Sequence, residues 1–376
     1  MMENCQVAMA ISKLQSAVSV AEKLSESSSE EEIKAAISGL NEAIEYYNEG
    51  KSLVQKVMTI QGVYEKVLED YDVAGTDLVK IVDAMGVAVA NEEFDSNEVI
   101  NGWLNGLPAA RTAHIYASVV IEGGLTPSLA EPVAISAVMT NQSFDEGENS
   151  RSGATGWTID WAADHIGWNN EAQQSGSNNA YEYWKATKFD MYQEVVGLPE
   201  GFYRVSCQGL YRPGNNTDEV AAIYAADPAN ARDMAFYVND KSVALTSIYD
   251  FAQEEAVGAD GEASCTLDGK TVYVPNTMIS AAAYFEAGYY TNTIDIEVKK
   301  GDSIKIGLKL AGNVVDANWC VFDNFKIQSL GATAPTAIEN VLAGGQASQA
   351  IYDLSGRKVS KAVKGIYIMN GKKVVR

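Results

Sequence analysis

Hydrophobic residues in the first third of the chain recur every three or four positions, which is the spacing of one face of an α-helix. The clearest stripes run through Ile11, Leu14, Val18, Ala21 and Leu24, then through Ile33, Ile37, Leu40, Ile44 and Tyr47, with two more over 53–68 and 78–85. Ser29 followed by Glu32 predicts a capping box at the start of the second helix, and Gly50 predicts its end or a bend. Shorter helices are expected at 97–104 and 109–121. The short polar loops between the stripes favour an antiparallel helical bundle over 1–122.

After a linker near 123–132, the pattern changes to short segments rich in β-branched and aromatic residues and bounded by turn-forming residues. The predicted strands cover 186–196, 201–211, 221–225, 235–238, 271–274, 291–298, 303–310 and 319–327. The Ala-rich segment 278–288 predicts a short helix that ends at Gly288. Many short strands separated by turns favour a jelly-roll-like antiparallel β-sandwich over 133–330.

A second linker at 331–335 precedes a small final unit over 337–376. Residues 350–359 and 365–375 predict two β-hairpins, and Asn370-Gly371 is a strong turn dipeptide. About forty residues are too few for a comfortable independent core, so this unit either docks on the sandwich or acts as a tag. The predicted fold class is therefore multidomain α and β: a helical bundle, a sandwich and a short β-hairpin unit.

The charge of the chain narrows the classes of partner. The net charge is −22 and the sequence pI is about 4.5. Such a surface repels phosphate backbones and anionic headgroups, so nucleic acid is not expected as a partner. No run of roughly 18 apolar residues occurs, so no transmembrane segment is expected. Residues 1–10 do not resemble a signal peptide.

The number and spacing of the cysteines and histidines limit which metal sites and disulfides the chain can form. The four cysteines are Cys5, Cys207, Cys265 and Cys320, without a C-x-x-C pair, and only two histidines occur. A structural zinc site of the usual spacing is therefore excluded. Cys207 and Cys320 are expected to be buried free thiols, while a disulfide between two of the four cysteines stays open.

The end of the chain resembles a family of secretion tails. The residues that carry the resemblance are Y-D-L-S-G-R-K-V at 352–359 and K-G-I-Y-I-M-N-G-K-K-V at 364–374. They are similar to the C-terminal tails of secreted proteins from gut Bacteroidetes, which look like shortened relatives of type IX sorting domains. The resemblance implies a secreted or cell-surface protein, and we expect that a leader peptide is missing from this chain.

The middle of the chain resembles the galactose-binding-domain-like sandwiches that accompany such tails. The resemblance covers about 140–330 and is carried by N-Q-S-F-D at 141–145, G-W-T at 156–158, the segment 183–212 and N-W-C-V-F-D-N-F-K-I at 318–327. It implies a β-sandwich fold and, more distantly, a carbohydrate-binding module.

Four of the six tryptophans fall between Trp157 and Trp184, beside a polar loop at 169–179. An indole or phenol ring can stack on the apolar face of a sugar while amides bind its hydroxyls. The candidate ligand-binding residues are Trp161, Trp168, Asn169, Tyr181 and Arg212. The alternative for the aromatic residues is a place in the core, and the alternative for Arg212 is pairing with nearby acids. If not so paired, Arg212 could bind a sugar acid.

The same resemblance implies a structural calcium ion where the first strand of the sandwich meets the last. Asp145 and Asp323 are the candidate ligands, because a hard cation prefers carboxylate and carbonyl oxygens. Alternatively, the two aspartates cap turns or accept hydrogen bonds from backbone amides.

Enzyme signatures such as G-x-S-x-G, H-E-x-x-H and the P-loop are absent from the sequence. The leading prediction is a non-catalytic carbohydrate-binding protein whose partner is a glycan. The main alternative is an adhesion or structural protein that binds another surface protein, and a third is a glycoside hydrolase of unrecognised type.

Overall fold

A computed structural model describes residues 5–146, 149–150, 153–168, 180–215, 217–312, 314–332, 351–353, 358–359, 366–369 and 372–375. For 149–150, 165–168 and the segments after 350, it describes the backbone alone. The chain divides into two compact units: residues 1–123 with 196–198, and the remainder. Both α and β structure are present, which confirms the mixed class. Among the described residues, no helix is both long and apolar enough to cross a membrane.

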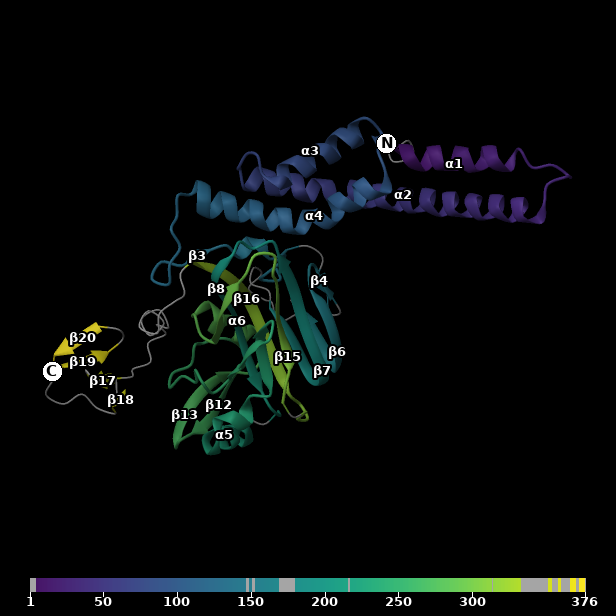
Figure 1. The fold of residues 1–376 in the computed structure, drawn as a ribbon. Coiled ribbons are helices and arrows are strands. Elements are labelled where there is room, and N and C mark those ends of the chain that lie inside the picture. The colour runs from purple at the N-terminus through teal and green to yellow at the C-terminus, as the bar shows by residue number, and fades with distance from the viewer. Residues whose placement is uncertain are drawn as a thin grey trace. The chain divides into compact units, whose positions relative to one another are not determined.

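The first unit is helical (Figure 1). Its helices are α1 (Ala8–Ala21), α2 (Glu30–Asp70), α3 (Asp77–Ala90), α4 (Asn97–Tyr116) and the π-helical turn η1 (Ala117–Glu122), and a short parallel pair joins β1 (Gln6–Val7) to β2 (Glu93–Phe94). Helix α1 lies beside the first half of α2, and α3 and α4 lie beside its second half. The predicted capping box of Ser29 and Glu32 is confirmed at the start of α2.

Helix α2 is one helix of 41 residues, so the prediction that it ends at Gly50 was wrong. Gly50 is buried, and a Cβ there would lie 2.7 Å from Asn97 Oδ1 and 3.1 Å from Val7 Cγ2. The missing side chain therefore makes room for the neighbouring elements instead of breaking the helix. The two short helices predicted at 97–104 and 109–121 are likewise one helix, α4, which contains Pro108.

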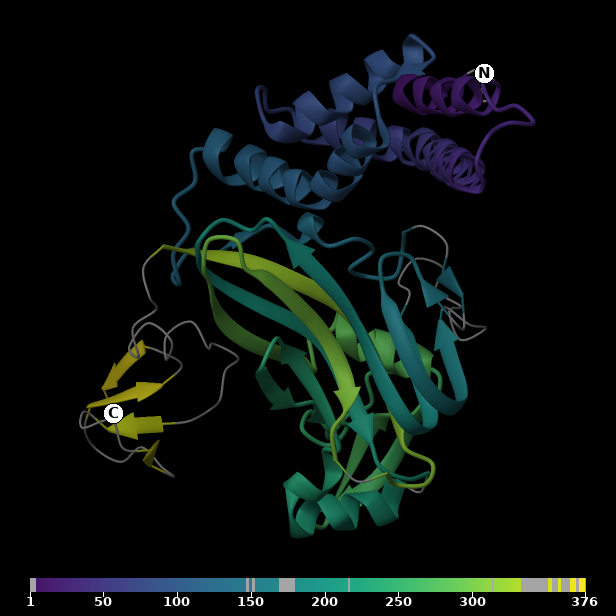
Figure 2. The ribbon, with the colours of Figure 1, turned by 45° about the vertical axis from the view of Figure 1, so that its right-hand side comes forward.

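The second unit is built on a ten-stranded, mostly antiparallel sheet (Figure 2). Its strands are β3 (Val133–Ala134), β6 (Thr158–Trp168), β7 (Tyr181–Val196), β8 (Gly201–Arg212), β9 (Met234–Val238), β10 (Lys241–Ala244), β11 (Thr246–Ser247), β14 (Thr291–Val298), β15 (Ser303–Leu310) and β16 (Trp319–Gly331). The order is β10-β9-β15-β7-β16-β8-β11, with β6 on β7, β3 on β16 and β14 on β8. Strand β11 pairs parallel with β8.

Strand β7 joins the two halves of this sheet. Its first residues, Tyr181 to Trp184, pair with β16, and its later part lies beside β15. The change occurs at Lys185, which has a φ of 54°. The buried side chain of Asn318 binds the next residue twice: its Oδ1 accepts from Ala186 N at 2.8 Å, and its Nδ2 donates to Ala186 O at 2.8 Å. The side-chain amide of Asn318 thus replaces a strand neighbour at the bend.

The sheet encloses an aromatic core. Phe236 of β9 and Phe325 of β16 are not on neighbouring strands, yet their ring centroids lie 6.3 Å apart. Phe144 contacts Tyr181 and Phe322 with centroid distances of 5.3 and 5.8 Å. The two halves of the sheet therefore face each other across one core.

A second hydrophobic cluster covers the outer face of β8 and β16. It is formed by α5 (Thr217–Ala226), the hairpin of β12 (Glu262–Leu267) and β13 (Lys270–Pro275), and α6 (Met278–Glu286), packed on Leu210, Trp319 and Val321. The predicted helix at 278–288 is confirmed. The strand predicted at 221–225 was wrong, because Val220 and Ala221 are buried on one face of α5 in this cluster.

The remaining short elements are η2 (Ser136–Val138), β4 (Asn149–Ser150), β5 (Gly153–Ala154) and η3 (Pro228–Ala231). Near the C-terminus, β17 (Ile351–Asp353), β18 (Lys358–Val359), β19 (Ile366–Met369) and β20 (Lys372–Val375) form a separate antiparallel sheet. The predicted turn at Asn370-Gly371 lies outside the described residues. All four cysteines are free, and the prediction of buried thiols at Cys207 and Cys320 is confirmed.

His114 ties the ends of three helices together. Its Nε2 donates to the carbonyl oxygen of Tyr71, which follows α2, at 2.6 Å. Its Nδ1 lies 2.7 Å from the hydroxyl of Thr76, and that hydroxyl also accepts from Val79 N at the start of α3. The imidazole is fully buried. This burial lowers its pKa below the ordinary value of 6.5.

We expect His114 to titrate below pH 6.5 in the folded protein. Because the unfolded chain then takes up the proton first, the free energy of unfolding decreases as the pH falls below 6.5. An NMR titration of the imidazole resonances measures this pKa directly. A His165→Gln variant assigns the two histidines, and a value for His114 at or above 6.5 would contradict the prediction.

Candidate functional site

The five predicted ligand-binding residues do not form one exposed aromatic platform. Trp161 lies on β6 and is 38% exposed, which leaves it accessible. The backbone of Trp168 belongs to β6, but its side chain and all of Asn169 lie outside the described residues. Tyr181 and Arg212 are both buried.

Tyr181 is a core residue, so the prediction that it contacts a ligand is wrong. Its side chain is fully buried, and its ring packs on Phe144 and Phe322. The segment 141–146 places Phe144 over this part of β7, which a reading of the aromatic residues along the strand does not reveal.

Arg212 is the last residue of β8 and is also covered, so the prediction of an exposed arginine that grips a sugar acid is wrong. Its guanidinium lies over the ring of Trp319, 5.0 Å from the ring centroid, and donates to Asn276 Oδ1. No ion pair joins it to a described carboxylate, so the alternative of pairing with local acids is not found either. Asn276 follows β13, so the segment that covers β8 and β16 also encloses Arg212.

The opposite half of the sheet carries a different surface, which we call the open face. It consists of the outward-pointing residues of β6, β7, β9 and β15, namely Asp160, Lys188, Asp190, Tyr192, Tyr237, Lys305, Gly307 and Lys309. The residues that alternate with them, such as Phe189, Met191 and Ile306, are buried in the aromatic core.

Tyr237 lies across strand β15 at the centre of the open face. Its hydroxyl donates to Asp190 Oδ1 on β7 at 2.7 Å. Gly307 is its partner on β15, and a Cβ at Gly307 would lie 2.9 Å from that hydroxyl and 2.4 Å from Met191 O. Glycine is therefore required for the phenol to reach Asp190. Burial and this hydrogen bond raise the pKa of Tyr237.

Lysines lie over the two phenol rings of the open face. Lys305 Nζ is 3.5 Å from the ring centroid of Tyr192 and 3.8 Å from Asp190 Oδ2. Lys309 Nζ is 4.8 Å from the ring centroid of Tyr237, and no described carboxylate pairs with it. At the edge, Lys188 pairs with Asp160 at 2.6 Å, and both side chains are exposed. The open face thus combines aromatic rings with charged donors and acceptors.

Asp323 on β16 is a second unusual group. Its side chain is fully buried, its Oδ1 accepts from Asn324 N at 2.6 Å, and its Oδ2 has no hydrogen-bond partner. Burial raises the pKa of this carboxyl well above its usual range, and the negative charge of Asp145 raises it further. The two predicted calcium ligands are therefore close enough to interact.

The residues around Asp323 fit a hard cation in one respect, because an orphaned buried carboxylate oxygen is a ligand that such an ion prefers. Asp145 follows Phe144, which anchors its turn in the aromatic core. Among the described residues, no group of three or more acidic, histidine or cysteine side chains could hold a metal. Any further ligands would have to be carbonyl or amide oxygens.

No protein-family model and no curated protein matches the chain. Among solved structures, it is similar to a family 61 carbohydrate-binding module in complex with β-1,4-galactotriose, at 17% identity and a TM-score of 0.27, over 50% of this chain and 94% of that one. A xylan-binding domain from Paenibacillus barcinonensis has 13% identity and a TM-score of 0.26, over 51% of this chain and 94% of that one. A cyclase from Fischerella sp. TAU has 10% identity and a TM-score of 0.28, over 52% of this chain and 97% of that one. At TM-scores of this size, the similarities say nothing on their own about what this chain binds.

We expect Gly307→Ala to lower the free energy of unfolding by about 1–3 kcal/mol, because the methyl group displaces the Tyr237 phenol from Asp190. Urea unfolding measures the change. Gly102→Ala is the matched control: Gly102 lies within α4 with nothing within 4 Å of its Cβ position, so alanine there should stabilise slightly. Equal stability of Gly307→Ala and the wild type would contradict the assigned role of Gly307.

Proposed function

We propose that this protein is a non-catalytic carbohydrate-binding protein of the bacterial surface or secretome. The observation that carries the proposal is the open face, where the half-buried Tyr192 and the buried Tyr237 lie among lysines and aspartates on a part of the sheet that α5, α6 and the β12–β13 hairpin do not cover. Aromatic rings with polar groups at their edges are the usual chemistry of sugar recognition.

The open face offers a sugar both kinds of contact. The ring of Tyr192 presents an apolar surface once the flexible side chain of Lys305 moves off it, and the C–H face of a pyranose fits such a surface. Lys309 has no carboxylate partner among the described residues and can donate to hydroxyl groups. Asp190, beside Tyr192, can accept from them.

Trp161 supplies a separate candidate contact. It pairs with Phe189 across the β6–β7 ladder, so it points to the opposite side of the sheet from Tyr192. We retain Trp161, Trp168 and Asn169 as proposed ligand contacts, of which Trp161 has a described side chain, on β6. A binding measurement on single variants separates these residues from the open face.

We also propose that Asp145 and Asp323 hold a structural calcium ion. The buried Oδ2 of Asp323 without a partner supports this proposal, since a cation would offset the cost of burying the carboxylate. The ion would fix the turn at 141–146 against β16, where Phe325 N donates to Gln142 O at 3.0 Å. It would have no part in ligand chemistry.

The acidic composition and the tail resemblance support a location outside the cell. An adhesion protein that binds another protein is the main alternative, and a hydrolase is the third. Screening the purified protein against a broad glycan array separates the first two, because only the carbohydrate-binding protein retains glycans. Release of reducing sugar from any retained glycan would identify the hydrolase.

We expect Tyr192→Ala to weaken glycan binding about tenfold or more, because the stacking surface is lost. Thr271→Ala, at an exposed position of β13 away from the open face, is the control and should bind as the wild type does. Isothermal titration with a glycan identified on the array measures both affinities. Binding that is lost in Trp161→Ala and kept in Tyr192→Ala would move the site to the edge of β6, and no binding at all would refute the proposed function.

We expect calcium to raise the melting temperature by roughly 5–10 °C at a hundredfold excess over its Kd, and a chelator to reverse the shift. Asp323→Asn should abolish the response, whereas Asp164→Asn, an exposed aspartate on β6, should keep it. Differential scanning calorimetry gives the readout. A melting temperature that ignores calcium and chelator alike would exclude the ion.

A further inference from the structure

Two lysine side chains converge over one phenol ring of the open face. Lys305 Nζ lies 5.8 Å and Lys309 Nζ lies 4.8 Å from the ring centroid of Tyr237. Both lysines belong to β15, on either side of Gly307, and both point outward. Among the described residues, Tyr237 is the one aromatic ring that has two cations over it. Two like charges therefore lie close to a single ring.

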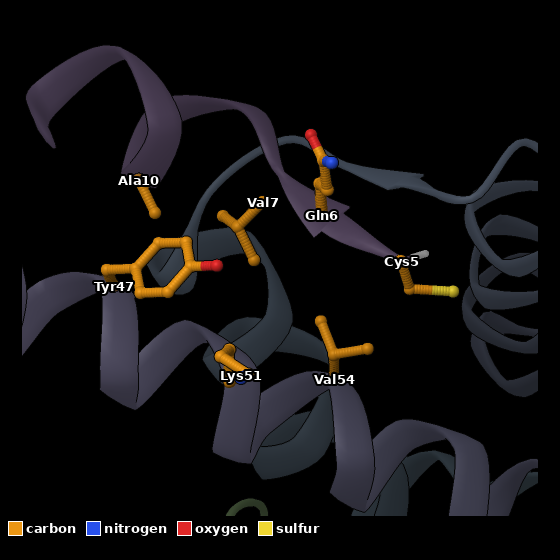
Figure 3. A pocket seen from close by; sticks show the side chains of 7 residues that line it. All are labelled: Cys5, Gln6, Val7, Ala10, Tyr47, Lys51 and Val54. Atoms are coloured by element: carbon orange, nitrogen blue, oxygen red, sulfur yellow. The ribbon is translucent and has the colours of Figure 1, made fainter. Parts of the chain in front are cut away.

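A lysine beside a tyrosine is not unusual by itself in this chain. In the helical unit, Lys51 and Tyr47 line a hollow of about 260 Å³, in which the side chains of Val7, Tyr47 and Val54 point toward one another (Figure 3). That hollow has one lysine, and its other lining side chains are neutral. The open face differs because it brings two ammonium groups together.

One carboxylate faces these two ammonium groups. Asp190 Oδ2 lies 3.8 Å from Lys305 Nζ, and Asp190 Oδ1 already accepts from the Tyr237 hydroxyl. Lys309 forms no ion pair with a described carboxylate. This part of the open face therefore keeps positive charge that the described residues do not neutralise, in a chain whose net charge is −22.

The remaining acidic side chains on this side of the sheet are Asp160 and Glu194. Asp160 pairs with Lys188 at 2.6 Å, and Glu194 is exposed on β7. Neither forms an ion pair with Lys305 or Lys309. Acidic residues outnumber basic ones by 50 to 28 in the whole chain, whereas lysines match the acidic residues here. An anionic ligand is therefore repelled less by this face than by the chain as a whole.

The lysines also determine when the rings can be reached. Lys305 Nζ lies 3.5 Å from the ring centroid of Tyr192, and Tyr237 is buried with both lysines over its ring. A neutral sugar that stacks on these rings must displace an ammonium group and offers it no opposite charge in return. A sugar with an anionic group offers the displaced ammonium a charge-assisted hydrogen bond. The arrangement therefore favours an acidic sugar over a neutral one.

We propose that the open face selects acidic glycans, and that Lys305 and Lys309 bind the carboxylate or sulfate group of a sugar. This inference rests on the proposed carbohydrate-binding function. On binding, the ammonium group of Lys305 leaves the ring of Tyr192 and pairs with the anionic group, while a sugar ring stacks on the phenol. Asp190 keeps its hydrogen bond from Tyr237.

Paired glycans that differ only in charge test the proposal. The probes are polygalacturonate, alginate and glucuronoxylan, each beside its carboxyl-reduced form, and carrageenan beside its desulfated form. Isothermal titration of the full chain should show at least one acidic glycan bound about tenfold or more tightly than its neutral counterpart. Raised salt should weaken that binding, because exposed ion pairs are screened. The carboxylate and sulfate pairs distinguish the two sources of the anionic group.

The double variant Lys305→Met, Lys309→Met removes both charges and keeps unbranched side chains of similar size. It should weaken binding of the acidic glycan about tenfold or more and leave binding of the neutral counterpart no weaker, because the rings lose their ammonium groups. A merely structural role of the lysines would weaken both glycans alike. The double variant Lys34→Met, Lys80→Met removes the same charge from exposed sites of the helical unit and should bind as the wild type does.

The outcomes separate this inference from the proposed function. Equal or lower affinity for the acidic member of every pair would overturn the inference and leave carbohydrate binding standing. An acidic preference that survives in the Lys305→Met, Lys309→Met variant would overturn it as well. Binding to none of the probes and to no arrayed glycan would refute the proposed function, and the inference with it.

Discussion

The β-region depends on the hydrogen bonds that Asn318 makes with the backbone of Ala186. Strand β7 serves both halves of the sheet, and to do so it must leave β16 at Lys185 and continue beside β15. A bend inside the sheet exposes backbone groups to an apolar interior, where an unpaired group costs about 1–3 kcal/mol. The carboxamide of Asn318 pairs with both groups of Ala186, so the bend needs no water and the two halves can enclose one core.

The way in which the two halves of the sheet enclose the core decides which surfaces of the sheet are available to a ligand. One half of the sheet turns Leu210, Trp319 and Val321 outward, and α5, the β12–β13 hairpin and α6 bury them in a second hydrophobic cluster. The other half turns outward residues that need no such cover, because Tyr192 and Tyr237 lie under the lysines and Asp190 accepts from a phenol. The division between a covered face and an open face therefore follows from which strands carry apolar side chains outward and which carry tyrosines with polar partners.

Local patterns in the sequence predicted local structure well. The capping box at Ser29, the helix at 278–288 and the strand at 291–298 each depend on neighbours within a few residues, and each was found. Predictions that depended on distant packing were less reliable. Gly50 stays helical because Asn97 and Val7 occupy its side-chain space, and 221–225 is helical because its apolar side packs on the second cluster. Tyr181 and Arg212 were misjudged for the same reason, since segments far away in the sequence cover them.

Arg212 and Asp323, two buried charged residues of the sheet, differ in how the protein compensates their charge. Arg212 lies on the electron-rich face of Trp319 and donates to Asn276, so the protein itself compensates part of the cost of burial, although the buried Nε has no hydrogen-bond partner among the described residues. Asp323 receives one backbone N–H, leaves its second oxygen unpaired, and is opposed by the like charge of Asp145. A buried carboxylate in that setting either stays protonated or requires a positive charge. Arg212 is therefore explained as a structural residue, whereas the burial of Asp323 is offset only by one backbone N–H and by the charge of Lys326.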